Sequence, residues 1–148
     1  MPTVSSCCGS WGGDRVDASS QSLLPSPVVL VLPADARLIR LARLLASGVA
    51  TRLGLSHDEI EDLRIGVDEV CATLVEAATG PAITLSYAVT DGSLVVSGHT
   101  SSGAPIDEAR LSISHRILQG IAHEHDVSYD GDTVSFRVVH RLNHRSVR

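Results

Sequence analysis

The hydrophobic periodicity of the chain constrains its fold more than any other feature of the sequence. Residues 82–89 with 93–99, and residues 126–130 with 133–142, are two pairs of alternating apolar and polar segments, each joined by a short turn that contains glycine. Such pairs predict antiparallel hairpins. A β-branched run at residues 28–33 precedes them, and segments of helical spacing lie between. The order β-α-α-β-β-α-β-β predicts an α+β fold, a two-layer sandwich of a mostly antiparallel sheet with helices packed on one face.

The first helical segment combines an apolar face with a row of arginines. Its apolar positions at helical spacing are Leu38, Leu41, Ala42, Leu45, Val49 and Leu53, and Gly54 ends the segment. Arg37, Arg40 and Arg43 lie three residues apart on the other side. Such a row is either a solvated helix face or a docking surface, and guanidinium groups suit docking because they form bidentate pairs with carboxylates. These three arginines are therefore candidate partner-binding residues.

The second helical segment begins at a capping box, in which Ser56 is followed three residues later by Glu59. Its apolar positions form one stripe, and Glu69 and Thr73 lie one turn apart on the face turned away from that stripe. A carboxylate and a hydroxyl in this arrangement form either a solvated surface or a functional pair. A third helix is expected at residues 111–123.

The ends of the chain differ in composition from its middle. Residues 1–26 contain many Ser and Gly and no periodicity, which predicts a disordered tail, and residues 27–142 then form the domain, followed by a polar tail at residues 143–148. Cys7 and Cys8 in the first tail have no matching pair of metal ligands. Because the sequence shows neither a secretory signal nor an apolar stretch of membrane length, a cytoplasmic location is expected.

Charge and composition exclude several functions. The 12 basic residues are all arginine and face 17 acidic residues, which gives a formal net charge of −5. Phosphate-loop NTPases, Schiff-base enzymes and Ser-Lys nucleophiles need a lysine ammonium group and are therefore excluded. The negative charge repels a phosphate backbone, and aromatic residues make up only 3% of the chain, so neither nucleic-acid binding nor base stacking is expected.

Residues 63–78, LRIGVDEVCATLVEAA, and the order of elements from Val28 to Leu142 resemble the GHKL (Bergerat-fold) ATPase superfamily. Within it, the chain looks like the actinobacterial anti-sigma-factor proteins related to serine kinases that sequester sigma factors. The resemblance implies that Glu69 is a general base and that Thr73 stands where an Asn ligates the magnesium ion between the nucleotide phosphates. It further implies a sigma factor and a STAS-type anti-anti-sigma protein as partners, a homodimer, and partner contacts near the arginine row.

The sequence departs from the family pattern at three places. A threonine hydroxyl at position 73 is a shorter and weaker magnesium ligand than an asparagine amide. No carboxylate lies between Asp91 and Asp107, where the family has the Asp that reads adenine, and Gly103 is the single glycine that could be a remnant of that motif. The approach to the last helix, residues 108–115, contains no glycine to expose backbone N–H groups to phosphate. The expected cofactor is therefore none, or weakly bound ATP and magnesium.

A histidine-rich cluster is the remaining candidate site. His123, Glu124 and His125 form an H-x-H pattern in an expected loop, and His115 precedes them on the expected third helix. Because no third ligand follows at a fixed spacing, the pattern is not specific for a metal site.

Two functions fit these observations. The first is an anti-sigma-factor-like regulator that sequesters a sigma factor and is countered by an anti-anti-sigma partner, with weak or lost ATP binding. The second is an active serine/threonine protein kinase of the same fold, which phosphorylates the anti-anti-sigma protein with Glu69 as base and magnesium near Thr73. A sensory domain that binds a small molecule in the vacated pocket is left open.

Overall fold

The computed structural model describes residues 24–143. Its elements are β1 (Val28–Pro33), a 3-10 turn (Ala36–Leu38), α1 (Ile39–Arg52), α2 (His57–Ala77), β2 (Ala82–Thr90), β3 (Ser93–Ser101), α3 (Glu108–Ile121), β4 (Glu124–Asp130) and β5 (Thr133–Arg141). Cys7, Cys8 and the rest of the first 23 residues lie outside the described part, as do residues 144–148. Leu24, which the composition assigns to the tail, is buried in the hydrophobic core.

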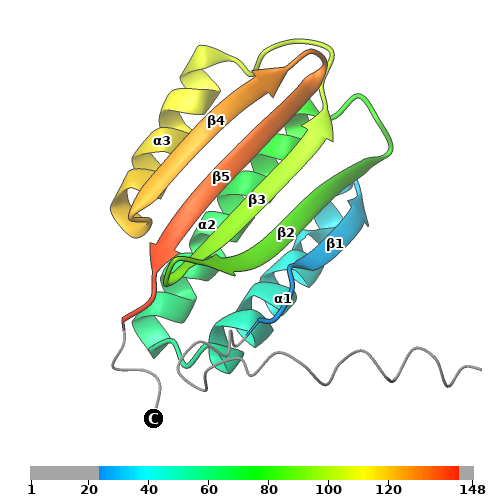
Figure 1. Ribbon diagram of the computed structural model, residues 1–148. Coiled ribbons are helices and arrows are strands. Elements are labelled where there is room, and N and C mark those ends of the chain that lie inside the picture. The colour runs from blue at the N-terminus through cyan, green and yellow to red at the C-terminus, as the bar shows by residue number, and fades with distance from the viewer. Residues whose placement is uncertain (1–23, 144–148) are drawn as a thin grey trace, which may run out of the picture.

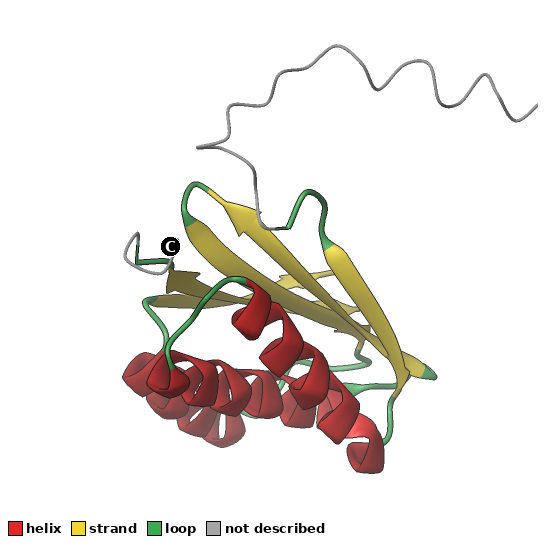
Figure 2. Ribbon diagram, turned by 90° about the horizontal axis from the view of Figure 1, so that it is seen from below, coloured by secondary structure: helices red, strands yellow, loops and turns green. Residues whose placement is uncertain are grey.

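The five strands form one antiparallel sheet in the order β1-β2-β3-β5-β4 (Figure 1). All the helices lie on one face of this sheet, and no helix of the described chain covers the other face (Figure 2). The predicted α+β two-layer sandwich is therefore confirmed. Within residues 24–143 no helix is both long and apolar enough to cross a membrane.

Local signals in the sequence explain where most elements begin and end. The Ser56 hydroxyl accepts the backbone N–H of Glu59, and the Glu59 carboxylate accepts the backbone N–H of Ser56, so the expected capping box starts α2. The two hairpins turn at Asp91 and Gly92, with φ of 50° and 71°, and at Gly131, with φ of 58°. Positive φ costs glycine little, which is why these positions close tight turns.

Two boundaries differ from the expectation. The helix α3 starts at Glu108, three residues before the apolar pattern, because the Asp107 side chain accepts the backbone N–H of Arg110 and caps the helix there. Glu124 and His125 lie in strand β4 and not in a loop, because β4 pairs with β5 from Glu124 onward. Pairing between strands is set by the whole sheet and is not visible in a short polar segment.

The helix α2 is the centre of the helical layer. Its apolar stripe packs on the sheet, α1 lies along one side of it, and α3 lies along the other (Figures 1 and 2). The face that carries Glu69 and Thr73 is therefore not open to solvent, and Thr73 is 1% exposed. On α1, Leu41 is 42% exposed and does not belong to the core face, which uses Ala46 and Ala50 instead. Small side chains at these positions let α1 approach α2 closely.

Candidate functional site

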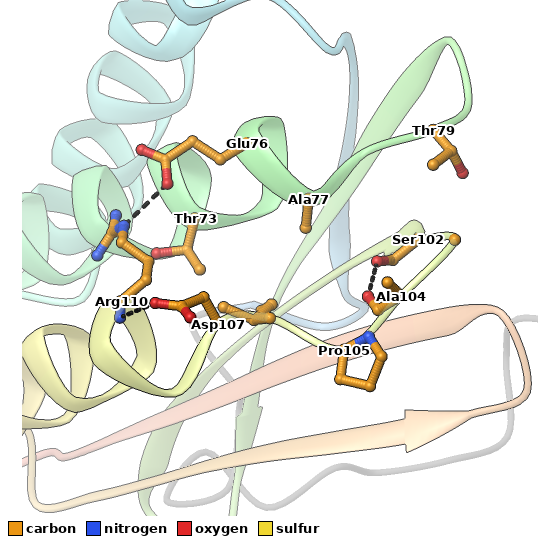
Figure 3. A pocket seen from close by; sticks show the side chains of 11 residues that line it. Thr73, Glu76, Ala77, Thr79, Ser102, Ala104, Pro105, Asp107 and Arg110 are labelled. Atoms are coloured by element: carbon orange, nitrogen blue, oxygen red, sulfur yellow. Dashed lines mark hydrogen bonds and ion pairs between the residues drawn. The ribbon is translucent and has the colours of Figure 1, made fainter.

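A cavity of about 480 Å³ lies between the C-terminal end of α2 and the connection from β3 to α3 (Figure 3). Thr73 and Gly103, two of the three residues expected at a nucleotide site, lie on its wall, and Glu69 lies one helical turn before Thr73. The residues that line the cavity are Thr73, Glu76, Ala77, Thr79, Ser102, Gly103, Ala104, Pro105, Ile106, Asp107 and Arg110. Thr73 and Gly103 therefore line one cavity with Glu69 close to Thr73, whereas the three arginines of the row lie outside the lining.

Arg110 lies on the wall of this cavity and contacts two carboxylates. From the first turn of α3, its Nη1 donates to Glu69 Oε1 at 2.5 Å. Its Nε donates to Glu76 Oε2 at 2.9 Å (Figure 3). Glu69 and Arg110 side chains are only 12% and 22% exposed, whereas that of Glu76 is 60% exposed. One guanidinium thus bridges two carboxylates that stand on α2.

Two hydroxyl groups complete the cluster. Ser114 Oγ donates to Glu69 Oε1 at 2.6 Å and lies 3.1 Å from Thr73 Oγ1. Thr73 Oγ1 also donates to the Glu69 backbone carbonyl at 2.9 Å. This is the usual bond of a threonine within a helix to the residue four positions earlier. The Thr73 hydroxyl is therefore engaged inside the protein and does not project freely into the cavity.

These contacts lower the pKa of Glu69. Burial alone raises the pKa of this carboxyl, but hydrogen bonds from Ser114 and Arg110, the positive charge of Arg110 and a contact with Thr73 outweigh burial. A general base works best when its pKa lies near the operating pH. Glu69 is shifted the opposite way, and its carboxylate is held in an ion pair with Arg110.

The polar groups of the expected nucleotide site already have partners within the protein. Three donors already converge on Glu69 Oε1, from Arg110, Ser114 and Thr73. Free N–H groups at a helix N-terminus attract phosphate. In α3 the Asp107 carboxylate caps this terminus, and Glu108 follows in the first turn. The same wall also carries the positive charge of Arg110, and the loop combines Gly103 with Ala104 and Pro105.

The arginine row does not form one continuous surface. Arg37 lies in the 3-10 turn and pairs with Asp35 at 2.6 Å, which lowers the pKa of Asp35 to about 2 through hydrogen bonds from Arg37. Arg43 pairs with Asp68 of α2 at 2.6 Å and so joins the two helices. Within residues 24–143, Arg40 alone of the three forms no ion pair. It is exposed beside Leu41 and Leu44, which are 42% and 67% exposed.

The histidine-rich cluster separates into different contacts. His115 Nδ1 of α3 and His125 Nε2 of β4 lie 2.8 Å apart, whereas His123 Nδ1 accepts the backbone N–H of Arg141. No group of three or more potential metal ligands is found among the described residues. The close imidazole pair is a hydrogen bond between a helix and a strand, and it requires at least one neutral ring.

The sequence alone did not identify Arg110, Ser114 and Glu76 as members of the site. Arg110 and Ser114 lie four residues apart on α3, and Glu76 follows Thr73 by three residues on α2. These spacings place each pair on one helix face. Which helix faces meet is decided by packing between α2 and α3, more than 30 residues apart in the chain.

Comparison with solved structures identifies a protein of similar fold. The chain aligns with a crystal structure of the RsbU and RsbW domains of Rv1364c from Mycobacterium tuberculosis, with a TM-score of 0.65 and 17% identity over 79% of this chain and 32% of that chain. The chain therefore shares its fold with part of that protein. No protein-family model matches the chain.

Sequence comparison identifies relatives that are serine-protein kinases. The chain is 39% identical over 54 residues to the serine-protein kinase RsbW of Halalkalibacterium halodurans, and 41% identical over 51 residues to that of Bacillus velezensis. These matches cover 36% and 34% of this chain, and 33% and 32% of the relatives. The chain thus spans about a third of the length of the curated relatives it matches. The expected resemblance to serine kinases that act as anti-sigma factors is confirmed by this similarity to RsbW serine-protein kinases.

Proposed function

We propose that this protein is an anti-sigma-factor-like regulator of transcription that sequesters a sigma factor in the cytoplasm and releases it to a STAS-type anti-anti-sigma protein. The likeness to RsbW in both fold and sequence supports this proposal. The second support is that the candidate site is built as an internal ion-pair cluster, which suits a binding domain better than a catalyst.

The outer face of α1 is the proposed partner-binding surface. It offers Arg40, which forms no ion pair within residues 24–143, beside the exposed Leu41 and Leu44. Such a combination of charge and apolar area is typical of protein interfaces. Arg37 and Arg43 would contribute less because their own acidic neighbours already pair with them. An acidic segment of the sigma factor would complement this surface.

Charge reversal at Arg40 tests the surface. We expect Arg40→Glu to weaken sigma-factor binding in a pull-down from the native host by about tenfold or more, because a rim charge of the wrong sign repels the partner. Arg116→Glu on α3 is the matched control, since Arg116 is also exposed but lies outside α1. Equal loss of binding in both variants, or unchanged binding in Arg40→Glu, would reject this placement.

We further propose that ATP binding is weak or lost. The lowered pKa of Glu69, the buried Thr73 hydroxyl and the acidic start of α3 support this. Titration calorimetry with ATP and magnesium is the test, and we expect no saturable heat at micromolar protein concentration. Saturable micromolar binding that Glu69→Ala abolishes or Thr73→Asn strengthens would favour the alternative, an active serine/threonine kinase that phosphorylates the anti-anti-sigma protein.

A further inference from the structure

The Arg110 guanidinium places a positive charge between two carboxylates of α2. Glu69 and Glu76 stand two turns apart on α2, and the Arg110 guanidinium reaches both, with its Nη1 and Nε at 2.5 and 2.9 Å from the carboxylate oxygens. The Nη1 group also donates to Ser114 Oγ at 3.0 Å. Charge-assisted bonds of this kind are stronger than neutral ones, and Glu69 is nearly buried.

The connection that leads into α3 is fixed at both ends. The backbone N–H of Ser102 donates to the Asp132 carbonyl, and the Ser102 hydroxyl donates to the Ala104 carbonyl. Near the other end, the backbone N–H of Ile106 donates to the Tyr129 hydroxyl at 3.2 Å. The segment between β3 and α3 is therefore tied to β4 and to the β4–β5 turn, and it forms one wall of the cavity (Figure 3).

We propose that Arg110 is a built-in latch, which bridges Glu69 and Glu76 in place of a metal cation and keeps α3 docked on α2 in the absence of nucleotide. The arrangement of the helical layer then does not depend on ATP or magnesium. A protein of this kind binds its partner constitutively and is controlled by competition between partners. This last consequence rests on the proposed function, whereas the latch itself does not.

Hydrogen–deuterium exchange of the whole chain, read by mass spectrometry with and without magnesium and ATP, tests the latch. We expect the amides of α3 in the wild type to exchange at the same rate in both conditions. In Arg110→Met they should exchange about tenfold faster, because the carboxylates lose their counter-charge and α3 opens more often. Arg116→Met is the matched control on the same helix, since Arg116 forms no ion pair within the described residues, and it should behave as the wild type.

Two results would overturn the latch: α3 exchange in Arg110→Met equal to the wild type, or a wild-type α3 that becomes protected only when magnesium and ATP are added. If Arg110→Met does not fold by circular dichroism, Glu76→Ala replaces it, since that carboxylate is largely exposed and only one arm of the bridge is removed. Faster α3 exchange in Glu76→Ala supports the bridge, and unchanged exchange rejects it.

A parallel pull-down separates the two proposals. If no sigma factor is captured but the exchange pattern is as expected, the proposed function fails and the latch stands. If a sigma factor is captured equally with and without magnesium and ATP, both hold. Capture that needs the nucleotide overturns the constitutive binding, whereas the latch itself is judged by the exchange of α3.

Discussion

Gly98 lies where α2 crosses β3, and its missing side chain sets the distance between helix and sheet. A methyl group at this position would lie 2.8 Å from Leu74 Cδ1, 2.9 Å from Leu85 Cδ2 and 3.1 Å from Val70 Cγ1. Leu74 and Leu85 are fully buried, so their ends cannot swing away without displacing other core atoms. Close packing of α2 on β3 in turn positions Glu69 and Thr73 toward α3.

We expect Gly98→Ala to destabilise the fold by about 1–3 kcal/mol, the usual cost of forcing an extra group into a full core. Urea unfolding followed by circular dichroism measures this free energy of unfolding. Gly120→Ala is the control, because a methyl group there meets nothing within 4 Å and alanine favours the helix α3. A Gly98→Ala variant as stable as the wild type would show that the core is not tightly packed at this crossing.

At the scale of elements, α2 and β5 enclose a histidine in apolar surroundings. His140 on β5 is 7% exposed and lies against Leu63, Gly66 and Val67 of α2. Within the described residues its Nε2 has no hydrogen-bond partner. Burial and the nearby His123 lower its pKa from the ordinary value of 6.5, and the carboxylates of Asp62 and Glu59 only partly oppose this.

This burial predicts a loss of stability in mild acid. Because the folded state holds His140 neutral, only the unfolded chain gains its proton as the pH falls below about 6.5, and folding stability therefore decreases there. We expect the melting temperature to fall between pH 7.5 and 5.5 in the wild type and to fall less in His140→Leu. His99→Leu on β3 is the control, since His99 is exposed. An equal fall in His140→Leu and the wild type would assign the effect to other groups.

At the scale of the whole molecule, the two edges of the sheet have opposite character. The β4 edge carries Glu124, Asp126 and Asp130, and charges on an edge strand discourage pairing with another chain. The β1 edge has no charged residue, and its Val29 and Val31 are 58% and 61% exposed. An apolar, uncharged edge strand is a surface that a second copy can cover.

We therefore expect a homodimer that uses the β1 edge. Light scattering after size exclusion should give twice the mass of the chain, and Val31→Lys should shift the protein to the monomer mass. Ser128→Lys on β4 is the matched control at the opposite edge and should leave the dimer intact. A wild-type protein that is monomeric at micromolar concentration would contradict this use of the edge.

The sequence by itself determined the parts of this protein that depend on neighbouring residues. Hairpin turns, the Ser56–Glu59 capping box and the position of Glu69 one turn before Thr73 all follow from bonds within a few residues, whose geometry is the same in any fold. From these and the element order, the α+β sandwich could be predicted.

Only the tertiary structure decided what those side chains meet. Helical periodicity placed Glu69 on a polar face, but the docking of α3 brought Arg110, 41 residues away, onto its carboxylate. In the same way, Arg43 pairs with Asp68 of α2, whereas Arg40 has no ion pair among the described residues. Pairing over such separations depends on how whole helices pack, and a residue's own helix does not encode it. The same polar face of α2 is therefore an internal ion-pair cluster in this protein.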